Sequence, residues 1–338
     1  MAFRVGVSHD FVSSDHPTSW GDIGLDRLAA EGIAWEFLPP DNGVLTAEHV
    51  AGFDAVVFGT PTVTAATVSG STPPRLLARF GVGLDAVDVD ACTRAGVAVT
   101  NTPDGARRAV ATAALTLILA TFHRLVDKNA LARRPAWDGR LDLIGQGLTG
   151  RTVGAVGLGN IASELFALMA PFATVNLAHD PYRDPREARA RGVELTGLED
   201  LFTRSDVVVV TAALTAQTRH LVNAGLLALM RPRAVLVNVS RGPIVDTAAL
   251  TEALAAGRLF GAGLDVTDPE PLPVGHPLLV LPNVVLAPHA LAWTDEMARG
   301  NGASVVQAII DVRQGRAPRY LADRAVLDHP RLRERVTA

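Results

Sequence analysis

"VGLGNIA", at residues 156–162, lies between an apolar, strand-like run and the helix-like segment "ELFALMAPF". In this G-x-G-x-x-A pattern, Gly157 permits a tight turn, Gly159 lets a backbone approach a pyrophosphate, and Ala162 allows close packing of helix on strand. The pattern alone is a weak signal, because an ordinary turn between a strand and a helix can have the same letters. The residues that we predict to bind a nucleotide cofactor here are Gly157, Gly159, Asn160 and Ile161.

The next strand-like run, "TVNLAHD", ends in Asp180. About 20 residues after the glycines is where an acidic side chain meets the ribose 2′-hydroxyl of a dinucleotide. A carboxylate repels a 2′-phosphate, so the sequence favours NAD over NADP. Asp180 can also be read as a turn residue before Pro181, and the nearby Arg183 leaves NADP open.

Apolar runs and turns repeat on both sides of this stretch. Six runs from residue 152 onward predict a doubly wound parallel sheet: "TVGAVGLG", "TVNLAHD", "DVVVVTA", "AVLVNVS", "GAGLDV" and "VVLAPH". Strand-like runs alternate with helical spacing over residues 1 to about 101 as well, which indicates a second α/β domain. Between the two, one long helix is predicted from about Arg107 to Arg134, ended by Pro135.

The composition excludes several classes of protein. The formal net charge of -4 disfavours binding to nucleic acid or to anionic lipid. The most apolar run, residues 110–122, is shorter than the roughly 20 residues needed to span a bilayer, so we expect a buried or interface helix and no membrane contact. Cys92 is the single cysteine, which excludes an internal disulfide or a multi-thiolate metal site and favours the cytoplasm.

Three later strand-like runs are each followed by charged or titratable side chains. Arg241, in "VNVSRGPIVD", can hold a substrate carboxylate with its guanidinium, although a surface arginine is an equal alternative. "GLDVTDPEPLP" offers Asp265, Asp268 and Glu270, which are commonly solvated or capping groups in such turns. His289, in "VLAPHALAWT", is alone beside apolar residues, as core histidines usually are; one of those acids could orient it and stabilise its protonated form.

These groups all leave the carboxyl ends of strands in one predicted sheet. Together they supply a nicotinamide site, an anion clamp, a proton donor and a carboxylate to orient that donor. The combination predicts an oxidoreductase acting on a small acid, which none of the groups indicates alone.

From about Leu76 to about Gly315 the chain resembles the D-isomer-specific 2-hydroxyacid dehydrogenases, which include phosphoglycerate dehydrogenase and the glyoxylate/hydroxypyruvate reductases. The motifs that carry the resemblance are "GVGLDAVDVDACTRAGVAVTNTP", "LTGRTVGAVGLGNIA", "NVSRGPIVDTAALTEALAAGRLFGAGLDV", "DPEPL" and "HPLLVLPNVVLAPH".

The resemblance implies a role for each site residue. Arg241 is expected to bind the substrate carboxylate and polarise the C2 carbonyl, and His289, paired with Glu270, to act as the general acid and base. Asp265 is expected to face the nicotinamide carboxamide. From the other domain, the amides of two residues are expected to help hold the carboxylate: Val82 and Gly83.

The resemblance also implies a nested layout. Residues 1–102 and 293–338 are expected to form a flavodoxin-like substrate domain, and residues 103–292 an inserted Rossmann-like NAD-binding domain, with the active site in the cleft. A homodimer built partly on the long helix is expected.

Some positions depart from the family pattern. Ala106 stands where the family typically has Asn, and Thr112 where it has Glu. Leu291 and Trp293 add bulk after His289, where the family has mostly small residues. The common substrates therefore cannot be assumed. Two other functions stay open: an NAD(H)-sensing module like the C-terminal-binding-protein corepressors, and formate dehydrogenase, which is disfavoured because that branch carries Gln at the position of Glu270.

Overall fold

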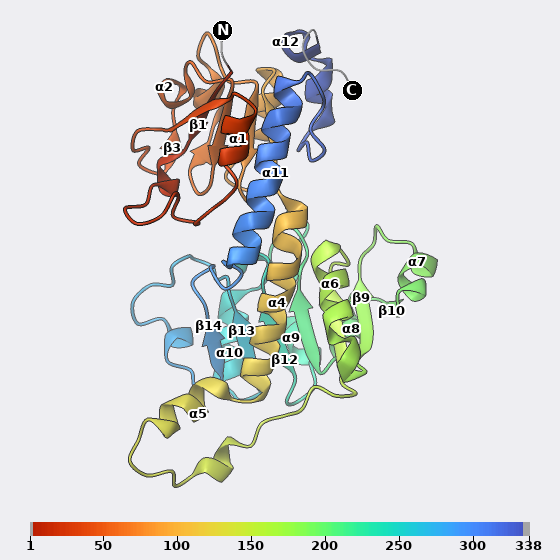
Figure 1. Cartoon of the computed structure of the whole chain (residues 1–338). Coiled ribbons are helices and arrows are strands. Elements are labelled where there is room, and N and C mark those ends of the chain that lie inside the picture. Colours follow the sequence, from red (N-terminus) through yellow and green to blue (C-terminus); the bar gives the residue numbers. More distant parts are fainter. Residues whose placement is uncertain (1–2, 334–338) are drawn as a thin grey trace. The chain divides into compact units, whose positions relative to one another are not determined.

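The computed structural model describes residues 3–333, and the chain divides into two compact units. One unit comprises residues 1–109 with 293–338, and the other residues 110–292 (Figure 1). The first division falls inside the helix α4 (Pro103–Phe122). The ends of the expected outer domain, residues 1–2 and 334–338, lie outside the described residues.

The first unit is built on a five-stranded parallel sheet. Its strands, in spatial order, are β2 (Ala34–Phe37), β1 (Arg4–Val7), β4 (Ala55–Phe58), β6 (Leu76–Arg79) and β7 (Ala98–Thr100). Within this sheet the order is 2-1-3-4-5, that of flavodoxin-like folds. A separate two-stranded sheet pairs β3 (Val44–Leu45) with β5 (Thr62–Val63).

The second unit is built on a seven-stranded parallel sheet. In spatial order its strands are β10 (Val193–Leu195), β9 (Val175–His179), β8 (Thr152–Val156), β11 (Val207–Val210), β12 (Val235–Asn238), β13 (Gly261–Leu264) and β14 (Val284–Leu286). The order 3-2-1-4-5-6 of dinucleotide-binding folds is extended here by one strand. The predicted α/β fold with doubly wound parallel sheets is confirmed, although the sequence predicted six strands here and missed β10.

Helices cover both faces of each sheet. In the first unit they are α1 (Asp26–Ala30), α2 (Ala47–Val50), α3 (Val89–Arg94), α11 (Asp295–Arg313) and α12 (Pro330–Arg333), with the 3-10 turns η1 (His9–Phe11), η2 (Ala65–Val68) and η7 (Arg324–Asp328). In the second unit they are α5 (Leu125–Ala132), α6 (Asn160–Met169), α7 (Pro185–Ala190), α8 (Leu198–Arg204), α9 (Ala224–Leu229) and α10 (Thr247–Ala255), with η3 (Arg140–Leu143), η4 (Ala170–Phe172), η5 (Gly242–Ile244) and η6 (Pro277–Leu279).

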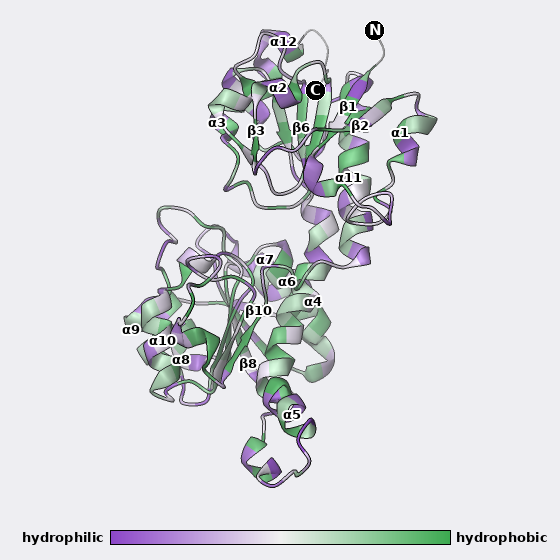
Figure 2. Cartoon of the chain, turned by 90° about the vertical axis from the view of Figure 1, so that its left-hand side faces the viewer, coloured by the Kyte–Doolittle hydropathy of each residue, from purple (hydrophilic) through white to green (hydrophobic). Residues whose placement is uncertain are grey.

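The strands are apolar along their whole length because each sheet is buried on both faces. On β11, Val207 and Val209 belong to the core under α4 and α6, whereas Val208 and Val210 belong to the core under α8, α9 and α10. Figure 2 shows these two helix layers on opposite sides of the hydrophobic strands. The continuous apolar runs in the sequence follow from this arrangement.

The long helix predicted over residues 107–134 is not continuous. α4 ends at Phe122, Arg124 takes a left-handed conformation with φ 51, and α5 begins at Leu125. The carbonyl of Phe122 accepts a hydrogen bond from the N–H of Gln146 at 2.8 Å, and Arg124 pairs with Asp127 at 2.9 Å. These later contacts end the first helix, so this prediction was wrong.

By length and composition, α4 could cross a membrane, and it is the one helix in the described part of the chain that meets this test. The apolar run quoted from the sequence was shorter because it left out the first turns of this 20-residue helix. Core helices of soluble proteins meet the same test. Ala114, Leu117 and Ile118 are buried with strands β8 and β11 in one core, so α4 is such a core helix.

Candidate active site

The glycine turn connects β8 to α6 in the second unit. Gly157 has φ 93, and a Cβ atom there would lie 2.8 Å from the Cα of Ala212, so glycine is required. Its N–H donates to the carbonyl of His179 at 2.9 Å, which fastens the turn to the end of β9. Gly159 is the N-cap of α6, and Asn160 is its first residue. The backbone therefore enters the helix directly from the turn, as a pyrophosphate site requires.

Asp180 is fixed beside this turn. Its Oδ2 atom accepts a hydrogen bond from the N–H of Leu158 at 2.9 Å, and its Oδ1 atom accepts one from the N–H of Tyr182 at 3.0 Å. Arg183 donates to the carbonyl of Leu158 at 2.9 Å and lies 3.8 Å from the carboxylate. A cavity of about 180 Å³ opens beside these groups, with Gly159 and Arg183 in its wall. The carboxylate thus caps its own turn and is hydrogen-bonded to Leu158, which lines the cavity at the glycine turn.

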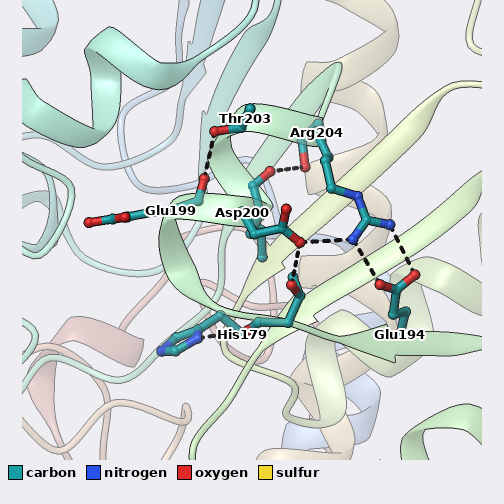
Figure 3. A network of polar contacts seen from close by, with 9 residues as sticks. His179, Glu194, Glu199, Asp200, Thr203 and Arg204 are labelled. Atoms are coloured by element: carbon teal, nitrogen blue, oxygen red, sulfur yellow. Dashed lines mark hydrogen bonds and ion pairs between the residues drawn. The ribbon is translucent and has the colours of Figure 1, made fainter.

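A polar network fastens the edge strand β10 next to β9 (Figure 3). Arg204, on α8, donates to both carboxylate oxygens of Glu194, at 2.8 and 3.0 Å, and to Asp200 at 2.8 Å. Nδ1 of His179 lies 3.1 Å from the carbonyl of Thr196. The hydrogen bond from Arg204 lowers the pKa of Glu194, and hydrogen bonds from Thr196 and then Arg204 lower the pKa of Asp200.

This network was not predicted from the sequence. The only signal for it was the spacing of four residues between Asp200 and Arg204, which brings two side chains together on a helix. The network is exposed, so its ion pairs add little stability. Its position suggests that it holds β10 against the strand that precedes Asp180.

His289 and Glu270 form a pair. Nδ1 of His289 lies 2.9 Å from Oε2 of Glu270, whose Oε1 accepts a hydrogen bond from the N–H of Thr267 at 3.0 Å. The histidine side chain is 47% exposed, so it is not a core residue. Within residues 3–333, Nε2 of His289 has no hydrogen-bond partner. With Nδ1 directed at the carboxylate, Nε2 is the atom that can exchange a proton with a ligand.

Asp265 holds the loop that carries His289. This carboxylate follows β13 and is 6% exposed. Its Oδ1 accepts hydrogen bonds from the N–H groups of Ala290 and Leu291, both at 3.1 Å, and its carbonyl accepts one from the N–H of His289 at 2.8 Å. The three candidate acids therefore have different partners. Glu270 contacts the side chain of His289, and Asp265 binds the backbone of the histidine loop. The Oδ2 atom of Asp268 lies 3.9 Å from Nη1 of Arg219.

Arg241 follows β12, and the next residue, Gly242, is packed against the loop that carries Glu270. Its Nη1 donates to the carbonyl of Ser240 at 2.7 Å, and its own carbonyl accepts from the side chain of Asn238 at 2.9 Å. At the next residue, Gly242, a Cβ atom would lie 1.8 Å from the carbonyl oxygen of Thr267. Arg241, Glu270 and His289 therefore follow the carboxyl ends of β12, β13 and β14, which are neighbours in one sheet.

Val82 and Gly83 lie in the first unit, in the loop after β6. The side chain of Asn101 donates to the carbonyl of Val82 at 2.9 Å, and the N–H of Thr102 donates to the carbonyl of Gly81 at 3.0 Å. In the described part of the chain the N–H groups of Val82 and Gly83 donate to no partner. The loop is thus held by its carbonyls, and two amides are left for a ligand.

Comparisons with known proteins agree with this fold. Residues 115–290 match the family model "D-isomer specific 2-hydroxyacid dehydrogenase, NAD binding domain". The chain is 36% identical over 313 residues to a glyoxylate reductase of Thermococcus onnurineus, covering 90% of this chain and 93% of that one. It is 38% identical over 294 residues to D-3-phosphoglycerate dehydrogenase of Mycobacterium bovis, covering 84% and 55%.

Among solved structures, a Thermus thermophilus protein of 34% sequence identity superposes with a TM-score of 0.82, over 95% of this chain and 100% of that one. The family model matches more than half of the chain, and the curated relatives are more than 30% identical to it. Both findings indicate the same family. The chain belongs to the D-isomer-specific 2-hydroxyacid dehydrogenase family, whose members are NAD-binding oxidoreductases.

Proposed function

We propose that the protein reduces a 2-keto acid to the D-2-hydroxy acid with NADH, or catalyses the reverse oxidation. The observation that carries this proposal is the 2.9 Å pair of His289 and Glu270, in the loops after β14 and β13, at the same edge of the sheet as Arg241, which follows β12. A positioned acid–base pair and a guanidinium at the same edge of a sheet supply the proton donor and the anion clamp that reduction of a keto acid requires.

The second unit fits a dinucleotide. Gly157 leaves no room for a side chain at the turn, and the cavity lined by Gly159, Asn160 and Arg183 borders the start of α6. When bound there, NADH supplies the hydride. The Asp180 carboxylate favours hydroxyls over a phosphate on the ribose, so NADH is the expected cofactor and NADPH the weaker one.

In the proposed reaction, Arg241 and the amides of Val82 and Gly83 hold the substrate carboxylate, and Arg241 also polarises the C2 carbonyl. As the hydride reaches C2, Nε2 of His289 gives its proton to the C2 oxygen. Glu270 keeps Nδ1–H in place and stabilises the imidazolium before transfer. Asp265 fixes the loop backbone around His289, and its role toward the nicotinamide carboxamide stays a prediction.

The test is consumption of NADH and NADPH by the purified protein with a panel of 2-keto acids. We expect at least one acid to be reduced, with NADH giving the higher kcat/KM. Tight NADH binding without reduction of any acid would instead support a sensing module that resembles the corepressors. A higher kcat/KM with NADPH would show that Arg183 outweighs Asp180 at the ribose.

We propose a cytoplasmic location. Cys92, on α3, is a buried free thiol. Its burial, with a smaller contribution from the Asp88 carboxylate, raises its pKa to about 12. The buried thiol is unreactive wherever the protein works, so the proposal rests on the single cysteine, which can form no internal disulfide, as is usual for proteins of reducing compartments.

We propose that the protein is a homodimer that uses the segment of residues 125–144. This segment carries five exposed large apolar side chains, each at least half exposed: Leu125, Val126, Trp137, Leu141 and Ile144. Such a group of side chains on one segment is typical of a surface that binds a partner.

Sedimentation is expected to give twice the chain mass of 35.5 kDa. The double variant Leu141→Asp, Ile144→Asp is expected to sediment as a monomer, because each aspartate would be desolvated in the interface. Val280→Asp, at an 80% exposed apolar position outside the segment, is the matched control and should stay dimeric. A wild-type protein that sediments at the mass of one chain would contradict the proposal.

A further inference from the structure

A second cavity lies in the second unit, at the edge of the seven-stranded sheet where β12, β13 and β14 begin. Its volume is about 300 Å³, which is large enough for a small organic molecule. Its wall comes from the end of α4, the start of α5 and the residues just before the three strands, and includes Arg124, Val126, Asp127, Arg233, Phe260 and Asn283. All of its lining residues belong to this one unit.

The cavity is at the opposite edge of this sheet from the proposed catalytic groups. Arg233 comes two residues before β12, whereas Arg241 comes three residues after it. Phe260 and Asn283 come directly before β13 and β14. The three strands are parallel, and a strand of four residues is about 13 Å long. A ligand in the cavity would therefore not displace a substrate held at Arg241 and His289.

The wall of the cavity carries one positive charge that no described residue balances. Arg124 and Asp127 neutralise each other, because Nε of the arginine lies 2.9 Å from the carboxylate. Among residues 3–333, the guanidinium of Arg233 pairs with no carboxylate, and its central carbon lies 5.2 Å from the centroid of the Phe260 ring. A guanidinium that stacks on a ring keeps the N–H groups along its edge, which match the two oxygens of a carboxylate.

The position of Arg233 is fixed from two sides. Its backbone is left-handed, with φ 79, which is uncommon for a residue other than glycine and has to be held by its surroundings. The buried side chain of Gln146 donates to the carbonyl of Arg233 at 2.9 Å, and the ring of Phe260 supports the guanidinium. The cationic group is thus positioned before a ligand binds, which reduces the entropy lost on binding.

Much of the remaining wall is apolar, with Leu259, Pro282 and Val285 in addition to Val126. A single positive charge matches a carboxylate, which carries one negative charge, better than a phosphate ester, which carries nearly two at neutral pH. An apolar body attached to the carboxylate would cover the aliphatic side chains. Val126 also belongs to the segment proposed for the homodimer, so one wall of the cavity adjoins that surface.

We propose that this cavity is a second binding site for a small carboxylic acid with an apolar body, in which Arg233 binds the carboxylate. The site is separate from the catalytic edge of the sheet. The inference does not rest on the proposed function, because the cavity uses none of the residues assigned to NADH or to the keto acid.

The test is binding of 4-fluorophenylacetate to the purified protein, followed by fluorine NMR. This acid has no keto group, so it cannot be reduced. A Kd of about 1–10 mM is expected for a ligand of this size. Arg233→Gln should weaken binding by about tenfold or more, because it removes a charge-assisted hydrogen bond. The neutral 4-fluorophenethyl alcohol should bind the wild type more weakly than the acid by a similar factor.

Three variants control for the removal of an arginine. Arg231→Gln is the matched control, because Arg231 is exposed, donates to the carbonyl of Thr203 at 3.2 Å and is not part of the cavity wall. Arg241→Gln removes only the proposed clamp at the catalytic edge. Both should keep the wild-type affinity for 4-fluorophenylacetate. Arg233→Lys keeps the charge but not the paired N–H groups, so it should lose less affinity than Arg233→Gln. Thermal melting of each variant shows that it is folded.

The outcomes that would overturn the site are distinct from those that concern catalysis. Binding that is lost in Arg241→Gln and kept in Arg233→Gln would place the acid at the catalytic edge alone. Equal affinities for the acid and the alcohol would show that Arg233 recognises no anion, and an absence of binding would show that the cavity is closed to ligands in the native assembly. Each of these results would leave the proposed reductase intact, because turnover of keto acids is measured separately.

Discussion

His289→Asn is expected to lower kcat for keto-acid reduction by about 10²–10⁴-fold, the usual contribution of a positioned acid–base group. The variant removes the one ring nitrogen, Nε2, that the pair with Glu270 leaves for a substrate proton. Asparagine is the suitable replacement because His289 has φ 55, a left-handed conformation that asparagine tolerates better than most residues. The affinity for NADH, measured by titration, should hardly change, because Gly157 and Asp180 follow other strands, β8 and β9.

The chain offers a matched control for this variant. His220 also has a left-handed backbone, with φ 50, and is exposed in the second unit. His220→Asn makes the same chemical change under the same backbone constraint and should keep wild-type turnover. If His289→Asn also kept near-normal turnover, the proton would have to come from another group and the proposed role of His289 would be wrong.

Central strands and their turns could be predicted from the sequence, and so could the apolar edge strands β7 and β14, but the edge strands β2 and β10 could not. Strands β8, β11 and β12 are buried on both faces, so their sequences are continuous apolar runs. β2 has alternately exposed and half-buried residues, and β10 has only three residues with one fully buried. Both are edge strands, where one side of the strand has no neighbour and the apolar pattern is weak.

The identities of the site residues could be proposed from the sequence, but their partners could not. Asp265, Asp268 and Glu270 were equivalent candidates as the partner of His289, because all three follow β13. The path of the loop decides among them: Thr267 orients Glu270 toward the ring, and Asp265 turns to the backbone of residues 290 and 291. Aromatic rings at residues 11, 20, 80 and 293 pack on one another, and no local pattern predicts contacts over that separation.

The close approach of Gly242 to Thr267 leads to a second large effect. A Cβ atom at Gly242 would lie 1.8 Å from the carbonyl oxygen and 2.1 Å from the carbonyl carbon of Thr267. Both contacts are to backbone, so no side-chain rotation can relieve them, and either the Arg241 turn or the loop that carries Glu270 must move. Overpacking of this kind commonly costs about 1–3 kcal/mol of stability. It should also separate the guanidinium from the acid–base pair.

Gly242→Ala is therefore expected to lower both the free energy of unfolding, measured with urea, and kcat/KM for the preferred acid. A misplacement of about 1 Å in a catalytic group can cost about 10²-fold in rate, so the kinetic loss should exceed what the fraction of unfolded protein explains. Gly147→Ala is the matched control, because a Cβ atom there meets nothing within 4 Å and the residue is exposed. If Gly242→Ala kept wild-type stability and kinetics, the Arg241 turn and the loop that carries Glu270 could move apart without cost. The register between Arg241 and the His289–Glu270 pair would then not be fixed by this contact.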